Sequence, residues 1–367
     1  MGLPYRSFVR PILKVMDSEK AHKNSINILS KFGESTTGQR LLNSIYGAPD
    51  EPITVLNNLF RHPLGLAAGF DKGADVLSSW PSLGFSWGEY GGVTRFPQDG
   101  NPKPRMFRAE KENALINRMG LNNPGAINIK DKLNQRKSAG NWPSIPIAAN
   151  IGRSSKTSND NAPQDYSDTL EILWDYADIF VLNVSSPNTP NLRELQNQSY
   201  LDLILRECMK VRDNSAVYKP ILLKLSPDRD DEKIIDSVDT AIRHNIDGFI
   251  ATNTTIKKPV PMNTKSRKIL SQEGGLSGRP LHNRSLEVIT LIHGHTNGNY
   301  PIIGVGGIES PDTAWSAITS GASLLQLYSS LVFQGPSVVS NIVKGIKKRR
   351  IDEGFVNISE AVGYKSL

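Results

Sequence analysis

The chain of 367 residues contains one cysteine, Cys208, and this scarcity excludes two kinds of chemistry. A single cysteine can form neither an intramolecular disulfide nor a multi-cysteine metal site. Cys208 lies in the helix-like segment LRECMK, where a packed thiol explains it better than a nucleophile does. We therefore expect a protein of a reducing compartment without a bound metal.

Long apolar runs are also missing. No run approaches the roughly 18 residues that a membrane-spanning helix requires. The first residues, MGLPYR, lack the apolar core of a signal peptide, and Arg6 stands where a myristoylation signal requires Ser or Thr. The sequence thus predicts neither a spanning segment, nor a secretion signal, nor a myristoyl group.

Acidic residues are outnumbered, since 36 Asp and Glu face 43 Lys and Arg, for a net charge of +7. Such an excess can attract nucleic acid or anionic lipid, but a modest excess commonly serves solubility. No basic patch is interleaved with aromatic residues, so we expect no nucleic-acid partner.

Eight short apolar runs recur along the chain, and most end in small or polar residues. They span residues 64–69, 89–93, 145–152, 179–185, 221–226, 248–253, 301–307 and 323–329. Continuous apolar runs are typical of strands buried on both faces of a parallel sheet. Most are separated by helix-like segments, such as SPDTAWSAITSGA, with a Ser cap and an early Pro, and DDEKIIDSVDTAIRHN, with acidic residues in its first turn.

Eight strands alternating with helices predict an α/β fold, a (β/α)8 TIM barrel, over residues 46–367. A doubly wound sheet is the alternative, but no strand is followed by G-x-G-x-x-G, because GVGGIES lacks the third glycine. Residues 1–45 stand apart as an N-terminal extension in which we expect two short amphipathic helices. These either plug the barrel floor or form an interfacial element that admits an apolar ligand or touches lipid.

The last two predicted strands carry a candidate phosphate site. The seventh ends in GVGG and the eighth in QLYSS. In barrels, the loops after these two strands often bind phosphate through backbone N–H groups. Gly304, Gly306 and Gly307 let the backbone approach a ligand closely, and Ser329 adds a hydroxyl.

Polar side chains at other strand ends predict a planar ligand. They are Lys72, Asn117, Asn150, Asn183, Asn188, Lys224, Thr252 and Asn253. Several amides at one barrel mouth suit a heterocycle with alternating C=O and N–H edges, because each amide offers both an acceptor and donors. Lys224 lies inside ILLKLS, where an unpaired ammonium is costly, so it must face an anion if this segment is a strand. FMN satisfies both features, and a lysine beside it would stabilise the anionic reduced ring.

The segment FVLNVSSPNTPNLREL, residues 180–195, turns a core strand into a run of hydrogen-bonding residues. Asn183 and Asn188 flank Ser186, while Pro187 and Pro190 stiffen the backbone. The sequence therefore predicts that the Ser186 hydroxyl is held in one place.

These segments resemble the class 2, quinone-dependent dihydroorotate dehydrogenases. The matching motifs are AAGFDKGA, GNPKPRMFR, NRMGLNN, NVSSPNTPNLR, ATNTT, GGLSGRPL, IIGVGG and LYSSLVFQGP, in family order. The resemblance implies oxidation of (S)-dihydroorotate to orotate with one FMN per chain. Electrons would pass to a membrane quinone, in the de novo synthesis of UMP.

The resemblance also implies a role for each matching position. Ser186 is the expected base that takes the C5 proton while the C6 hydride goes to the flavin. The expected substrate contacts are Lys72, Asn117, Arg118, Met119, Gly120, Leu121, Asn183, Asn188, Asn253 and Thr254. The expected FMN contacts are Ala68, Gly69, Lys72, Gly92, Asn150, Asn183, Lys224, Thr252, Gly278, Gly307, Tyr328 and Ser329. His22 and Arg108 are expected near the quinone entrance.

Ser186 favours class 2, because class 1 enzymes use cysteine as the base and the one cysteine here lies elsewhere. A free hydroxyl is weakly basic, so Ser186 needs a relay to water or proton loss concerted with hydride departure. Two positions depart from the family pattern. Gly92 replaces Ser or Thr, so one flavin hydrogen bond must come from backbone, water or Thr94, and Leu121 replaces Phe.

The resemblance places the N-terminal helices where class 2 enzymes have a membrane-associated extension. We expect a monomer, peripheral on the cytoplasmic side of a bacterial inner membrane, with the mitochondrial inner membrane as the alternative. Two other functions stay open. One is a related flavin barrel with a soluble acceptor such as fumarate or NAD. The other is a non-redox barrel for a sugar phosphate, with Lys224 as a Schiff-base candidate.

Overall fold

The structure, a computed structural model, describes residues 5–365, without the side chains of Arg6 and Phe8. The expectation about myristoylation therefore lies largely outside the described residues.

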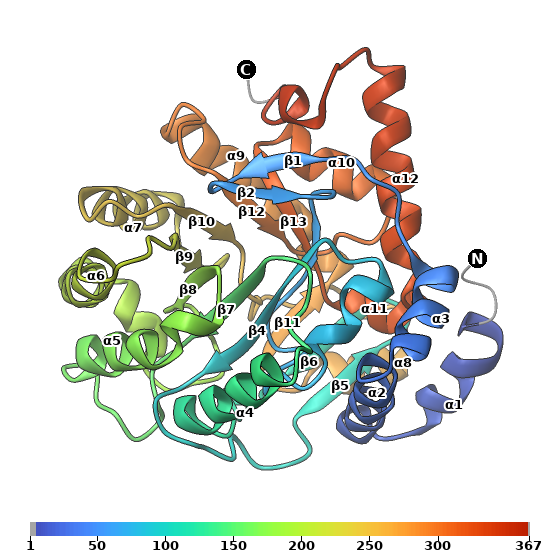
Figure 1. Cartoon of the computed structure of the whole chain (residues 1–367), viewed down its shortest axis with the longest axis horizontal. Coiled ribbons are helices and arrows are strands. Elements are labelled where there is room, and N and C mark those ends of the chain that lie inside the picture. The colour runs from blue at the N-terminus through green and yellow to red at the C-terminus, as the bar shows by residue number, and fades with distance from the viewer. Residues whose placement is uncertain (1–4, 366–367) are drawn as a thin grey trace.

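Eight parallel strands close into a barrel with helices outside it (Figure 1). The strands are β3 (Leu64–Leu66), β4 (Trp87–Val93), β7 (Ile147–Ile151), β8 (Ile179–Asn183), β9 (Ile221–Leu225), β10 (Gly248–Ala251), β12 (Ile302–Val305) and β13 (Ala322–Leu327). They pair in the order β10-β12-β13-β3-β4-β7-β8-β9, and β9 pairs with β10 to close the ring. Each predicted apolar run overlaps one of them, so the predicted (β/α)8 barrel is confirmed.

Helices surround the barrel on its outer side (Figure 1). They are α4 (Ala126–Ser138), α5 (Ala162–Leu173), α6 (Gln198–Asp213), α7 (Asp231–Arg243), α9 (His282–His295), α10 (Pro311–Thr319) and α12 (Ser337–Asp352). Ser310 caps α10 through a reciprocal capping box with Thr313, and Asp231 and Glu232 lie in the first turn of α7. Both segments were predicted as helices and are confirmed.

Smaller elements surround this frame. A hairpin pairs β1 (Ile53–Val55) with β2 (Asn58–Phe60), and a separate antiparallel sheet joins β5 (Met106–Ala109), β6 (Ala114–Asn117) and β11 (Gly275–Gly278). Two short helices are α8 (Thr264–Leu270) and α11 (Ser329–Gln334). The 3-10 turns are Leu77–Ser79, Pro81–Leu83, Trp174–Tyr176, Leu192–Gln196, Arg279–Leu281 and Ile358–Ala361.

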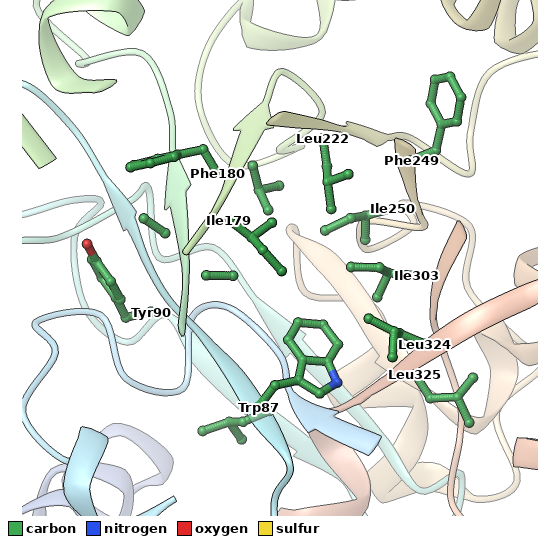
Figure 2. Packing of buried hydrophobic residues seen from close by; sticks show 14 of the residues in the cluster. Trp87, Tyr90, Ile179, Phe180, Leu222, Phe249, Ile250, Ile303, Leu324 and Leu325 are labelled. Atoms are coloured by element: carbon green, nitrogen blue, oxygen red, sulfur yellow. The ribbon is translucent and has the colours of Figure 1, made fainter. Parts of the chain in front are cut away.

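The core has two layers, because successive strand residues point to opposite faces. Figure 2 shows inward-pointing Trp87, Ile179, Leu222, Ile250, Ile303 and Leu324, and outward-pointing Tyr90, Phe180, Phe249 and Leu325. All of these side chains are buried. Gly65 is required beside Trp87, since a Cβ there would lie 2.3 Å from the indole ring. Strands buried on both faces explain why the runs lack strict polar alternation.

The N-terminal extension contains three α-helices where the sequence predicted two. They are α1 (Arg10–Val15), which follows a π-helical turn (Tyr5–Val9), α2 (Ser18–Gly33) and α3 (Thr36–Tyr46). The prediction was wrong because two caps divide the segment. Asp17 accepts hydrogen bonds from the backbone N of Glu19 and Lys20, and Ser35 accepts one from Gly38. Across residues 5–365, no helix is long and apolar enough to cross a bilayer.

Candidate active site

A cavity lies at the carboxyl ends of the barrel strands, where TIM barrels have their active sites. It brings together Ser186 and all but one of the predicted substrate and FMN residues. Those residues are Ala68, Gly69, Lys72, Gly92, Asn117, Met119, Gly120, Leu121, Asn150, Asn183, Asn188, Lys224, Thr252, Asn253, Thr254, Gly278, Gly307, Tyr328 and Ser329. Gly306 lines it too. Gly304 does not, because it faces Ile289 of α9 and Leu325.

The Arg118 side chain points away from this cavity, contrary to its expected substrate contact. Its guanidinium donates to the Gln272 side chain and to the backbone O of Glu273, at 3.2 and 3.1 Å, and lies 4.8 Å from the centre of the Phe107 ring. A further bond goes to the backbone O of Pro104. Arg118 therefore links loops outside the site, and only its chain neighbours reach the cavity.

The predicted asparagines form a directed chain of hydrogen bonds. Asn253 Nδ2 donates to Asn183 Oδ1 at 3.1 Å, and Asn183 Nδ2 donates to Asn150 Oδ1 at 3.0 Å. Asn150 Nδ2 then donates to the Glu89 carboxylate at 2.5 Å. Because a carboxylate only accepts, Glu89 fixes the direction of every amide in the chain. The barrel mouth thus presents donors and acceptors in a fixed order.

Glu89 and Gln326 are site residues that the sequence analysis missed. Glu89 is fully buried in β4, accepts a hydrogen bond from Gln326 Nε2, and lies 4.0 Å from Lys224 Nζ. Gln326 lines the cavity, and its Oε1 is buried without a partner among the described residues. The sequence did contain a signal for Glu89 and Gln326, because a polar residue inside a buried strand requires a partner, as Lys224 does.

Ser186 lies in the loop after β8, and its side chain is buried in the wall of the cavity. The backbone N of Asn188 donates to Ser186 Oγ at 3.3 Å. Within residues 5–365, no carboxylate or imidazole hydrogen-bonds to this hydroxyl. Its local geometry is fixed by the loop, but no neighbouring side chain raises its basicity.

Lys72 and Lys224 are the two lysines that line this cavity. Burial and, to a smaller extent, the charge of Arg105 lower the pKa of Lys72, and Glu19 opposes them, so that the pKa is about 8. A buried ammonium with this pKa favours an anionic ligand, because a bound negative charge restores the protonated form.

The two departures from the family pattern touch each other. A Cβ on Gly92 would lie 2.9 Å from Leu121 Cδ2, so the leucine fills space that a side chain at position 92 would need. Thr94, considered as a replacement hydrogen-bond donor, bonds the backbone O of Phe96 and accepts from Asn123 instead. It does not line the cavity. The flavin hydrogen bond that Gly92 cannot make must therefore come from a backbone group or from water.

A second cavity, of about 1350 Å³, lies between α1–α3, β5 and α11 and contains both predicted quinone residues. Burial lowers the pKa of His22 to about 4, and Lys72 adds to the effect, so the imidazole is neutral at pH 7. Arg108 donates to the backbone O of Leu13 and Lys14 at 2.7 and 3.3 Å, which holds the C-terminal end of α1. Tyr328 lines both cavities.

Metal ligation was not expected. Among residues 5–365, no group of three or more His, Cys, Asp or Glu is arranged to hold a metal ion.

Comparisons with known proteins all point to one family. The model of the family described as dihydroorotate dehydrogenase matches residues 52–349. A dihydroorotate dehydrogenase (quinone) of Gloeobacter violaceus is 44% identical over 356 residues, 96% of this chain and 97% of that protein. One of Trichodesmium erythraeum is 42% identical, with 98% of each chain covered. A ligand-free DHODH structure from Eimeria tenella superposes with a TM-score of 0.86 at 31% identity, covering 95% of this chain and 99% of that one.

Proposed function

The chain belongs to the dihydroorotate dehydrogenase family, and we propose that its two cavities serve the two halves of one redox reaction. The activity is the oxidation of dihydroorotate to orotate with a quinone as electron acceptor, a step of pyrimidine biosynthesis. This assignment replaces the soluble-acceptor and sugar-phosphate alternatives. The observation that carries the proposed site is the directed amide chain, which shares one cavity with Ser186 and the glycine-rich phosphate loop.

The first cavity fits FMN, one per chain. Gly306 and Gly307, together with Ser329 at the start of α11, would hold the phosphate through backbone N–H groups and a hydroxyl. Ser277 Oγ and Gln326 Oε1 line the cavity and have no partner among the described residues, as expected of groups that bond a ligand. The remaining contacts would be the predicted FMN residues. When bound, FMN supplies an acceptor for the C6 hydride and a donor to quinone.

Dihydroorotate would bind beside the flavin, against the amides and Lys72. Asn117 and Asn188 are joined by a 3.1 Å hydrogen bond, and Asn253 Oδ1 accepts from the backbone N of Thr254 at 2.8 Å, so these groups are oriented before substrate arrives. The Lys72 ammonium would bind the substrate carboxylate. Met119, Gly120 and Leu121 would supply the neighbouring wall.

Ser186 would take the C5 proton of dihydroorotate. Because no base hydrogen-bonds to its hydroxyl within the described residues, the proton must pass to water or leave together with the hydride. Burial of Ser186 supports this role, since exclusion of bulk water keeps the acceptor in one position.

The second cavity would bind the quinone. Its lining is mainly apolar, His22 and Arg108 are among its polar residues, and Tyr328 lines both this cavity and the FMN cavity. A neutral imidazole can donate one hydrogen bond to a quinone oxygen without placing a charge in an apolar site.

Residues 1–45 would give access to the membrane, and residues 46–367 would form the catalytic domain. Exposed apolar side chains gather on the N-terminal helices, namely Val9, Ile12, Val15, Ile28, Phe32, Leu41 and Ile45. Such a surface on amphipathic helices suits the lipid interface, where a quinone is available. We propose a monomer, peripheral on the cytoplasmic side of a bacterial inner membrane, with the mitochondrial inner membrane as the alternative.

The turnover assay tests the function. The purified protein should reduce a quinone analogue only when dihydroorotate is added, and fumarate or NAD should not replace the quinone. Quinone reduction that ignores dihydroorotate would refute the proposal, and equal rates with a soluble acceptor would refute the assignment of the second cavity.

A further inference from the structure

One ion pair joins the helix beside the quinone cavity to a loop beside the substrate. Glu19 lies in the first turn of α2, and Arg105 directly precedes β5. Arg105 Nη2 donates to Glu19 Oε1 at 2.7 Å, and Arg105 Nε donates to Oε2 at 3.0 Å. Arg105 is only 6% exposed. An ion pair with two hydrogen bonds fixes the orientation of the two side chains as well as the distance between them.

The third nitrogen of the same guanidinium holds the loop between residues 97 and 105. Arg105 Nη1 donates to the backbone O of Asp99 and of Asn101, at 2.6 and 2.9 Å. The loop has no spare room there, because a Cβ on Gly100 would lie 2.1 Å from the backbone O of Met119 and 3.0 Å from Arg105 Nη1. The position of Arg105 therefore determines the position of Asn101.

Asn101 passes this constraint to the catalytic loop. Its Nδ2 donates to the backbone O of Asn188 and of Arg118, each at 3.0 Å. The backbone N of Asn188 in turn donates to Ser186 Oγ. A continuous series of hydrogen-bonded residues therefore links Glu19 to Ser186 through Arg105, Asn101 and Asn188. His22, one turn after Glu19 on α2, lines the quinone cavity.

We propose that Glu19 and Arg105 are positioning residues, whose ion pair couples the placement of α2 to the placement of Asn188 and Ser186. The quinone-side helix must lie correctly against the barrel for dihydroorotate to be oxidised efficiently. This inference rests on the proposed function, because it assumes that Ser186 and Asn188 act on dihydroorotate. Neither Glu19 nor Arg105 lines the first cavity, so a kinetic effect must reach it through the loop or through Lys72, whose pKa Glu19 raises. Faster hydrogen exchange of the loop identifies the first route.

The experiment compares Glu19→Gln with a matched change, Glu51→Gln. Glu51 accepts a hydrogen bond from Arg350 of α12, is buried like Arg105, and lines neither cavity. Both substitutions remove one charge from a partly buried Arg–Glu pair that joins distant segments, so both should lower stability. Only Glu19 is connected to Ser186.

Three quantities should be measured on holoenzyme: anaerobic flavin reduction by dihydroorotate, reoxidation by a soluble quinone analogue, and hydrogen exchange of residues 97–105. In Glu19→Gln, a loosened loop should slow flavin reduction by about tenfold to 100-fold, since a small misplacement of reacting groups costs that much. Reoxidation should change much less, and exchange of the loop should accelerate. Glu51→Gln should leave both rates and the exchange near wild type.

The Glu19→Asp variant keeps the charge with a shorter reach, and flavin reduction should lie between wild type and Glu19→Gln. It carries the same comparison if Glu19→Gln does not fold. A wild-type rate of flavin reduction in the Glu19 variants, or equal losses in both half-reactions for the Glu19 and Glu51 variants, would overturn the coupling. Failure of the wild type to be reduced by dihydroorotate would instead overturn the proposed function.

Discussion

Ser186 is the residue on which the proposed proton transfer depends most. Replacing Ser186 with Ala should lower turnover with dihydroorotate by about 100-fold or more, because general-base assistance contributes a factor of this order or larger. Flavin binding should persist, since Ser186 is not among the proposed FMN contacts. Steady-state turnover and the absorbance of the bound flavin measure the two effects. Unchanged turnover in Ser186→Ala would remove this residue from the mechanism.

Lys72 predicts a specific pH dependence. Burial lowers its pKa to about 8, so the free enzyme carries the ammonium below that pH and loses it above. An anionic substrate binds the charged form, so the KM for dihydroorotate should rise as pH increases through 8, by up to about tenfold per pH unit. Lys72→Met should show a high KM without this dependence. A wild-type KM that stays constant across this alkaline range would contradict the assignment.

For single residues, the sequence predicted which residues belong to the site better than it predicted where their side chains point. Asn183, Ser186 and Lys224 could be predicted as site residues, because a polar group in or next to a buried strand requires a hydrogen-bonding or charged partner. The sequence could not show that the Arg118 side chain points away from the cavity, because this direction depends on Gln272 and Glu273, which are distant in sequence. Glu89 was missed although it is a polar residue inside a buried strand, as Lys224 is, but its partners, on other strands, are visible only in the structure.

At the scale of elements, the N-terminal helices should provide membrane contact. Val15, at the end of α1, is 86% exposed, and an aspartate there should reduce binding to vesicles that contain anionic lipid, because it puts a charge at the apolar interface. Val356→Asp is the matched control, since Val356 is 80% exposed near the opposite terminus. Cosedimentation measures both variants. Equal binding of the two variants would argue against this face as the lipid contact.

The elements themselves were predictable where a local signal exists. The eight barrel strands follow from apolar runs, α7 from acidic residues in its first turn, and α10 from a Ser cap and an early Pro. The number of N-terminal helices was not predictable, because the caps at Asp17 and Ser35 divide a continuous apolar pattern into separate short helices. Strand β11 (Gly275–Gly278) was not predicted either, because its glycine-rich sequence has no apolar run.

The whole molecule combines a predictable barrel with an unpredicted sheet at its mouth. Alternation of strands and helices specifies the barrel, because each strand pairs with neighbours that follow simple βα connections in most cases. The β5-β6-β11 sheet joins segments far apart in sequence, and local periodicity carries no information about such pairing. Yet this sheet holds Asn117 at the first cavity and Arg108 at the second, so it connects the two proposed sites.

The central claim is that one cavity holds FMN and dihydroorotate together, and the absorption spectrum of the purified protein tests it most directly. Without oxygen, the spectrum should be that of one oxidised FMN per chain. Dihydroorotate alone should bleach it, and a quinone analogue should restore it. A protein without flavin, or a flavin spectrum that dihydroorotate leaves unchanged, would contradict the account.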